Sequence, residues 1–365
     1  MRTYHHLPAG VNQHLARSET QPLILQWNVA VNQGRSSIRL RICGKIEFST
    51  ASHLMNLGIS AIEYALPSKS VSVRELAEAG LLVSRAEQLQ SFGFDRCYIS
   101  DESADELALR AAAALLDNCG VRPESVDLLL YAGAIAPSHH IAGGQFVSNF
   151  NYPATKLQYE LSLTHASVAG ISQAGCMGLT YAAKFASDFL RSNGEAKCVL
   201  CVSADVLPKG VQREILYNVI SDGACALMVT RNSVQNRIVA HRSVTKGYYW
   251  DCISRKNEIL AAYFPTAKNL VQDLLRGAGC APEDLRMVLP HNVSYRSWEI
   301  LLDLIGVKKE QLFAANISQK GHVIAADNWI NLKDAMTANL LIPGDKLLAF
   351  NFGLGANWAA TLIEH

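Results

Sequence analysis

The 365-residue sequence has no long apolar run, no excess of charge of one sign and no paired cysteine framework. No apolar stretch is long enough to span a bilayer, so we expect neither a signal peptide nor a membrane anchor. The net charge is only +1 and the basic residues are scattered, which argues against a nucleic-acid partner. Nine cysteines, an odd number without framework spacing, indicate a reducing cytoplasm.

The composition is that of a folded protein, since 49% of the residues are hydrophobic and 18% are charged. Only the first part of the chain departs from this, because residues 1–57 mix short apolar pieces with Gly, Asn, Gln and Arg. We therefore expect residues 1–57 to be an N-terminal extension of uncertain order that precedes the periodic body of the chain.

The body begins with an alternation of helix and buried strand. Ser103 and Glu106 have the spacing of a capping box, and apolar residues recur at helical spacing after them. Gly120 is a typical C-terminal stop for that helix. The short apolar run 126–132 then predicts a strand buried on both faces. Together these signals predict an α/β protein.

The residue pattern that precedes this strand recurs later in the chain, and all the matching residues are shifted by the same number of positions. The matching residues are Gly120, Pro123 and Glu124 in the first copy and Gly279, Pro282 and Glu283 in the second. A second repeated pattern is a glycine shortly before a predicted strand, Gly194 before 198–203 and Gly344 before 347–352. We therefore predict a duplicated α/β unit with halves at 58–240 and 241–365.

Cys176 is the most informative single residue, because it lies in a turn of small residues that leads into a predicted helix. The free N–H groups and positive dipole end of a helix start favour the thiolate over the thiol. A nucleophile is one interpretation of this pattern. The other is a buried cysteine that acts as a small hydrophobic residue.

Three segments of the second half offer partners for Cys176. His291 follows a predicted strand, and His322 follows Gly321 in a polar loop. Gly353 and Gly355 interrupt a C-terminal strand, where backbone N–H groups could face an oxyanion together with the N–H of Cys176. The alternative is two structural histidines and an ordinary hairpin turn. Pseudo-twofold symmetry would bring these segments and Cys176 together at the seam between the halves.

The order of these four segments resembles β-ketoacyl-acyl-carrier-protein synthase III and its relatives in the thiolase superfamily. The similarity runs from about residue 59 to the C-terminus and is most specific over 290–358. It implies a five-layered αβαβα thiolase-like fold, a cytoplasmic homodimer, and no metal, nucleotide or redox cofactor. The implied substrates are thioesters of acyl carrier protein or coenzyme A, used in fatty acid, polyketide or other secondary metabolite biosynthesis.

The resemblance also implies roles for individual residues. Cys176 would be acylated, and His291 would be its first partner. The oxyanion contacts would come from Cys176 and the turn Gly353, Leu354 and Gly355, with the Leu354 N–H as donor. Arg296 and Asn292 would contact the carrier or its pantetheine arm. Two departures stand out: Asn292-Val293-Ser294 replaces Gln-Ala-Asn after the first histidine, and His322 occupies the place of an asparagine.

A Cys-His-His set resembles that of elongating condensing enzymes, in which two imidazoles stabilise the enolate of a decarboxylated malonyl group. The leading expectation is therefore a 3-oxoacyl-ACP synthase III-like acyltransferase with Cys176, His291 and His322 as catalytic residues. Two alternatives stay open. One is acyl transfer to an alcohol or amine, with a histidine as general base. The other is a catalytically silent partner subunit that retains the fold.

Other signals refine these expectations. Residues 83–94 lack the tryptophan and Arg-Thr-Gly-Ile pattern found near coenzyme A in relatives, which favours a carrier-protein donor. No cysteine follows Cys280, which disfavours a thiolase. Cys198 and Cys201 would point to opposite faces of a strand, which does not suit a metal site. His139 and His140 lie in a loop that in relatives approaches the tunnel of the neighbouring subunit. Lys209 and Arg213 could help to meet an acidic carrier, but the favoured interpretation is two solvated surface charges.

Overall fold

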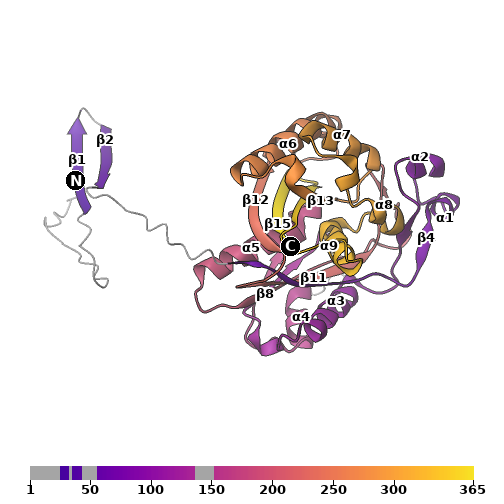
Figure 1. The fold of residues 1–365 in the computed structure, drawn as a ribbon, viewed down its shortest axis with the longest axis horizontal. Helices are drawn as coiled ribbons and strands as arrows, with labels where there is room; N and C mark the ends of the chain where they lie inside the picture. Colours follow the sequence, from indigo (N-terminus) through magenta and orange to yellow (C-terminus); the bar gives the residue numbers. More distant parts are fainter. Residues whose placement is uncertain (1–24, 33–34, 43–55, 136–151) are drawn as a thin grey trace, which may run out of the picture. The chain divides into compact units, whose positions relative to one another are not determined.

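The computed structural model describes residues 25–32, 35–42, 56–135 and 152–365. Contacts within the chain separate residues 1–54 from residues 55–365. In the first unit, strands β1 (Leu25–Asn32) and β2 (Arg35–Ile42) form an antiparallel hairpin. The second unit contains all the other described helices and strands (Figure 1).

Nine strands of the second unit form one mixed sheet in the order β13-β14-β15-β12-β3-β11-β8-β6-β7. The strands are β3 (Gly58–Ala65), β6 (Leu128–Ala132), β7 (Ser167–Ile171), β8 (Cys198–Asp205), β11 (Gly223–Thr230), β12 (Arg237–Thr245), β13 (Leu285–Leu289), β14 (Lys346–Gly353) and β15 (Asn357–Glu364). A single register pair, Arg237 with Gly58, joins β12 to β3. The sheet therefore consists of two arcs that meet at one point.

The two arcs repeat one pattern of strands. From the junction outward, the first arc runs β3, β11, β8, β6 and the second runs β12, β15, β14, β13. In each arc the outer two of these strands are parallel and the others are antiparallel. This repeated order is what a duplicated α/β unit produces. The connection between the arcs is the segment 231–236, so β12 begins before the expected boundary at residue 240.

Helices cover both faces of each arc (Figure 1). Helices α3 (Ala104–Cys119) and α4 (Pro153–Glu160) pack outside the first arc, and α6 (Lys256–Gly277) and α7 (Tyr295–Ile305) pack outside the second. Helices α5 (Gly178–Ser192) and α9 (Asp327–Thr337) share a core with strands of both arcs. The result is five layers, α, β, α, β and α, as predicted.

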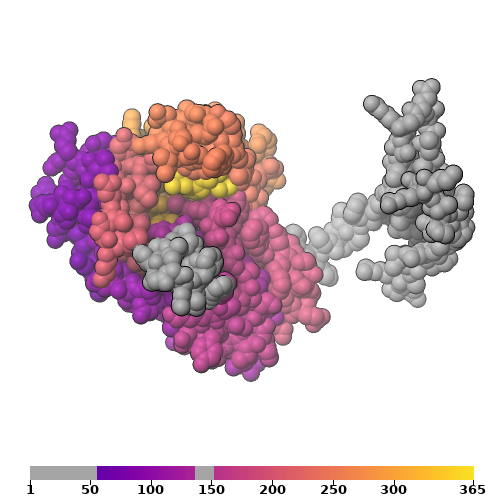
Figure 2. Space-filling view, turned by 180° about the vertical axis from the view of Figure 1, so that it is seen from behind, coloured from indigo at the N-terminus to yellow at the C-terminus, as the bar shows by residue number. Residues whose placement is uncertain are grey.

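Short elements complete the second unit. They are α1 (Val73–Glu78), α2 (Ala86–Ser91), α8 (Ala315–Lys320), β4 (Ser70–Ser72), β5 (Arg96–Tyr98), β9 (Glu214–Ile215) and β10 (Asn218–Val219). In the space-filling view, the yellow C-terminal part of the chain shows only as a strip between the orange and magenta parts (Figure 2). The C-terminal strands are accordingly buried; the Trp358 side chain, for example, has no exposed surface.

Several local predictions are confirmed. Helix α3 begins with the Ser103–Glu106 capping box, in which the Ser103 N–H donates to Glu106 at 2.7 Å, and ends at Gly120 with φ +65°. Every residue of β8 is buried, because helices cover both of its faces. Cys198 belongs to the outer core and Cys201 to the central core, so the two thiols lie on opposite faces.

Candidate active site

Cys176 lies in the single 3₁₀ turn Gly175–Met177 that leads directly into α5. The side chain of Asn351 on β14 fixes this turn, because its Nδ2 donates to the Cys176 carbonyl at 3.3 Å and to the Thr180 hydroxyl at 3.1 Å. The helix start therefore holds the sulfur, and a strand of the second arc holds the helix start.

The turn between β14 and β15 packs directly against the Cys176 turn. A Cβ atom added at Gly353 would lie 2.5 Å from the Ala174 carbonyl oxygen, and one added at Gly175 would lie 3.0 Å from the Leu354 carbonyl oxygen. Only glycine allows this approach, since real Cβ atoms do not come so close to backbone. The two glycines thus bring the predicted oxyanion turn against the nucleophile turn.

His291 follows the end of β13 and is almost fully buried. Its carbonyl accepts a hydrogen bond from the Trp298 indole on α7 at 2.8 Å, and its Nδ1 faces the Phe352 N–H at 3.5 Å. Because Nδ1 faces a donor, the proton of the neutral ring is assigned to Nε2. Burial, and then the charge of His322, hold the pKa of His291 well below its usual 6.5. His291 is therefore a neutral imidazole with an Nε2–H group.

The backbone of His322 is fixed by the first half of the chain. Its N–H donates to the Val219 carbonyl at 2.8 Å, and its carbonyl accepts from the Ser221 N–H at 2.9 Å. The preceding Gly321 has φ +65°, and a Cβ there would lie 2.9 Å from the Val219 oxygen. Glycine is therefore required at 321 to place His322.

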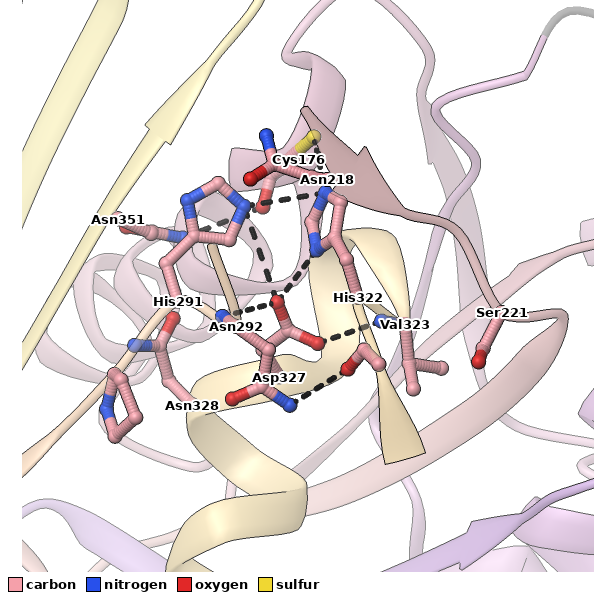
Figure 3. Close-up of polar contacts among 12 residues, drawn as sticks. Cys176, Asn218, Ser221, His291, Asn292, His322, Val323, Asp327, Asn328 and Asn351 are labelled. Carbon is pink, nitrogen blue, oxygen red and sulfur yellow. Dashed lines mark hydrogen bonds and ion pairs between the residues drawn. The ribbon is translucent and has the colours of Figure 1, made fainter. Parts of the chain in front are cut away.

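The structure brings Cys176, His291 and His322 together. The sulfur of Cys176 lies 3.4 Å from Nε2 of His322, and the Nε2 atoms of the two histidines lie 3.3 Å apart. Figure 3 shows both rings between the sulfur and a carboxylate below them. One ligand atom from each of the three residues falls within 4.8 Å of the others, a spacing that a metal ion would also accept. The proton assigned to Nε2 of His291 disfavours that use of the site.

The carboxylate in Figure 3 is Asp327, the first residue of α9, which the sequence analysis did not select. Its Oδ2 lies 2.6 Å from Nδ1 of His322 and accepts the Asn292 N–H at 2.7 Å. Its Oδ1 accepts the Val323 N–H at 2.7 Å. Three donors thus meet this carboxylate, and the contact with Nδ1 orients the His322 ring. The sequence signal for this contact was that Asp327 begins a helix five residues after His322.

Asp327 also determines the charge of His322. Burial by itself lowers the pKa of His322, but the charges of Asp327 and then Cys176, with hydrogen bonds to both, outweigh burial and raise the pKa to about 10. At neutral pH His322 is therefore an imidazolium, with one N–H on Asp327 and the other directed at the sulfur. The N–H groups of His291 and His322 converge on one point beside Cys176.

The other predicted site residues are placed differently. Arg296 is exposed at the start of α7 and pairs with Glu299 at 2.9 Å. Asn292 is fully buried, with its Nδ2 on the Gly321 carbonyl at 2.9 Å and its Oδ1 on Asn331 at 2.9 Å. Through these two contacts the buried side chain of Asn292 links the segments that carry the two histidines.

In the turn Gly353–Gly355, fewer backbone N–H groups are free to bind an oxyanion than the sequence suggests. The Gly355 N–H donates to the sulfur of Cys252 at 2.8 Å, so this amide is already engaged. Leu354 is 37% exposed, and its backbone lies against Gly175. Cys252 could not be predicted from the sequence, because nothing in its local pattern connects it to Gly355, 103 positions later.

Two further expectations are resolved by position. Arg213 is not a surface charge: it is 3% exposed and forms a buried pair with Asp222 at 2.5 Å. Lys209 is exposed and pairs with Asp101 at 2.8 Å. His139 and His140 lie outside the described residues. Among the described residues, no helix has the length and apolar character needed to cross a membrane.

Comparisons by sequence find relatives of this chain. The family models for 3-oxoacyl-[acyl-carrier-protein] synthase III and for its C-terminal domain match residues 172–247 and 275–365. The β-ketoacyl-[acyl-carrier-protein] synthase III of Aquifex aeolicus is 27% identical over 282 residues, which cover 74% of this chain and 87% of the relative. The corresponding enzyme of Clostridium perfringens is 26% identical over 303 residues, covering 74% and 88%.

The comparison with solved structures finds the same Aquifex aeolicus enzyme. The crystal structure of the Aquifex aeolicus enzyme superposes with a TM-score of 0.74 at 25% identity, covering 85% of this chain and all of that one. The thiolase-like fold and the family expected from the sequence are thus confirmed. The chain is similar to 3-oxoacyl-[acyl-carrier-protein] synthase III in sequence, over residues 172–247 and 275–365, and in fold.

Proposed function

We propose that this chain is an acyltransferase that forms an acyl thioester on Cys176 and condenses the acyl group with a malonyl-type thioester. The observation that carries the proposal is the position of the Cys176 sulfur, 3.4 Å from one of two imidazole Nε2 atoms that are themselves 3.3 Å apart. A nucleophile and two convergent donors are the groups that this two-step reaction needs.

In the first step the sulfur of Cys176 attacks the carbonyl carbon of the acyl donor. The His322 imidazolium stabilises the thiolate before attack, and its orientation is fixed by Asp327. The N–H groups of Cys176 and Leu354 face the oxyanion that forms, since the Gly355 N–H is engaged by Cys252. The new C–S bond then replaces the donor's C–S bond, and the donor leaves as a thiolate that takes up a proton from water, so that His322 keeps its Nε2–H.

In the second step the malonyl-type thioester places its carbonyl oxygen between the Nε2–H groups of His291 and His322. Breaking the bond to the carboxylate releases carbon dioxide and leaves the electron pair on the enolate, which the two N–H groups stabilise. The enolate carbon attacks the acyl carbon, and Cys176 leaves as a thiolate. The product is a β-ketoacyl thioester two carbons longer than the acyl donor, which follows from the loss of one carbon as carbon dioxide.

The proposal is tested by supplying an acyl donor and a malonyl thioester labelled in its free carboxylate. We expect labelled carbon dioxide and β-ketoacyl product in equal amounts. Acyl-Cys176 that forms but yields neither would overturn the condensation step. A chain that gains no acyl mass from any carrier or coenzyme A donor would instead identify a silent partner subunit.

One observation favours a second function, acyl transfer to an alcohol or amine. Cys176, His322 and Asp327 form a continuous chain of contacts, at 3.4 Å and 2.6 Å, in the order of a nucleophile, base and carboxylate triad. In that reaction His322 would return to the neutral form and accept the proton of the attacking alcohol or amine. An ester or amide product without carbon dioxide would support this function over condensation.

We extend the proposal to the donor, assembly and location. The acyl donor is a thioester of acyl carrier protein and not of coenzyme A. The donor approaches past the exposed side chain of Arg296. No metal or redox group takes part in the proposed reaction. The chain acts as a homodimer, which the exposed edge strand β7 supports because it ends the sheet and can pair with a second copy. All eight described cysteines are free, which suits a cytoplasmic enzyme.

Replacing Asp327 with asparagine is predicted to lower the pKa of His322. The aspartate is the largest group that raises this pKa, so its neutral replacement lets burial dominate. Wild-type His322 stays charged as pH rises until the pKa of about 10 is reached, whereas the variant loses its charge at a lower pH. We expect condensation at pH 7 to fall on the order of 100-fold. An NMR titration of the histidine Cε1–H signals measures the shift.

Asp334→Asn is the matched control, because Asp334 lies further along α9 and pairs with Lys320 instead of a histidine. It should leave the His322 titration unchanged. An Asp327→Asn variant with the wild-type titration and full activity would show that Asp327 does not govern His322. Circular dichroism of both variants verifies that they fold.

A further inference from the structure

Cys252 connects a remote segment of the chain to the turn between β14 and β15. Its sulfur accepts the Gly355 N–H at 2.8 Å. Earlier in the same segment, the Lys246 N–H donates to the Ala356 carbonyl at 3.0 Å. The segment 246–252 is therefore bonded to two successive residues of the turn.

The thiol of Cys252 is itself held in place. It is half-buried and donates to the Tyr249 carbonyl at 3.3 Å, which leaves the lone pairs of the sulfur for the Gly355 N–H. The thiol thus acts as a donor and as an acceptor at once. Alanine at position 252 would lose both contacts, whereas serine would keep a group that can make both.

Two backbone N–H groups in the candidate active site have no acceptor. Among the residues that the structure describes, neither the Cys176 N–H nor the Leu354 N–H donates a hydrogen bond. A Cβ atom added at Gly353 would lie 3.2 Å from the Cys176 nitrogen, and one added at Gly175 would lie 3.1 Å from the Leu354 nitrogen. The two free donors therefore belong to turns in direct contact, as an oxyanion site requires.

The conformation of the β14–β15 turn depends on contacts from outside it. Gly355 has φ +90°, and the fully buried Ala356 has φ +56°. A left-handed conformation is unfavourable for a residue with a Cβ atom, so it persists only where the surrounding structure fixes it. The hydrogen bonds to Lys246 and Cys252 supply part of that restraint.

We propose that Cys252 is a positioning residue for the oxyanion that forms when Cys176 attacks a thioester. By accepting the Gly355 N–H, its sulfur fixes the planar peptide between Leu354 and Gly355, and with it the direction of the Leu354 N–H. Cys252 acts through Gly355 and undergoes no chemical change. The inference rests on the proposed acylation of Cys176, and it holds for both candidate functions because both begin with that step.

The test compares Cys252→Ala and Cys252→Ser with the wild type in single-turnover acylation. The mass of the peptide that contains residue 176 is followed over a range of acyl thioester concentrations. A misplaced donor costs less than a missing one, so we expect Cys252→Ala to lower the maximum acylation rate about tenfold to 100-fold. The half-saturating concentration should change by less than about twofold, because the donor stabilises the oxyanion more than the bound thioester. Cys252→Ser should recover most of the rate.

Alkylation of Cys176 by iodoacetamide separates positioning from general damage. This reaction displaces iodide from a saturated carbon and forms no oxyanion, so its rate depends on the thiolate alone. It should be the same in Cys252→Ala and the wild type. Cys119→Ala is the matched control, because Cys119 also donates to the carbonyl three residues before it but accepts no N–H group in the described part of the chain.

Each outcome decides between the inference and the proposed function. Acylation at the wild-type rate in Cys252→Ala would overturn the inference and leave the proposed function intact. Equal losses of acylation and alkylation would also overturn it, since the nucleophile itself would then be damaged. So would a Cys252→Ser variant no faster than Cys252→Ala. A wild-type chain that no acyl thioester acylates would overturn the proposed function, and the inference with it.

Discussion

Alanine in place of Cys176 is expected to abolish the acyl-enzyme and to lower product formation by on the order of 1,000-fold or more. The reason is that the sulfur is the only nucleophile that the structure places against His322, at 3.4 Å, among the described residues. The measurement is the mass of the peptide that contains residue 176 after incubation with an acyl thioester, together with the rate of product formation.

Cys119→Ala provides the matched control for Cys176. Cys119 is half-buried at the end of α3, where its thiol donates to the Leu116 carbonyl at 3.7 Å, so its loss should leave acylation intact. An acyl adduct that forms at full yield in the Cys176→Ala variant would place the nucleophile elsewhere and remove the basis of the proposed function.

Alanine in place of His322 is expected to block the second step while Cys176 still becomes acylated. Loss of one of the two N–H groups that face the enolate should lower condensation about 100- to 10,000-fold. Acylation needs only the thiolate and the backbone donors, so the acyl mass should still appear, more slowly than in the wild type. Intact mass spectrometry of the acyl-enzyme and product assays separate the two steps.

His322→Asn distinguishes the donor role of His322 from a general base role. An amide restores an N–H donor but cannot accept a proton, so it should recover part of the condensation activity. The same variant should not recover acyl transfer to an alcohol or amine. Equal acylation and turnover in His322→Ala and the wild type would exclude His322 from the mechanism.

The fold was largely predictable because its signals are local. The capping box at Ser103, the stop at Gly120 and the repeated Gly-Pro-Glu phrase each depend on neighbours within a few residues. The repeat then implied two related halves. The meeting of Cys176 with His291 and His322 followed from this symmetry and from the family resemblance, since strand ends and helix starts of related halves share a seam.

The parts that could not be predicted depend on partners far away in sequence. Asp327 looks like an ordinary acidic residue in the first turn of a helix, and only the fold shows that His322 and two backbone N–H groups meet it. Arg213 looks like a solvated charge until Asp222 is seen beside it in the core. The resemblance implied a contact of Asn292 with the carrier or its pantetheine arm, and only the fold shows that this side chain is buried.

The central claim is that two imidazole N–H groups converge on the carbonyl oxygen of the second substrate beside an acylated Cys176. A crystal structure of the enzyme with a malonyl thioester analogue that cannot lose carbon dioxide tests it most directly. The account predicts the thioester oxygen about 3 Å from Nε2 of both His291 and His322. A thioester oxygen held by other groups, with either ring beyond hydrogen-bonding distance, would contradict it.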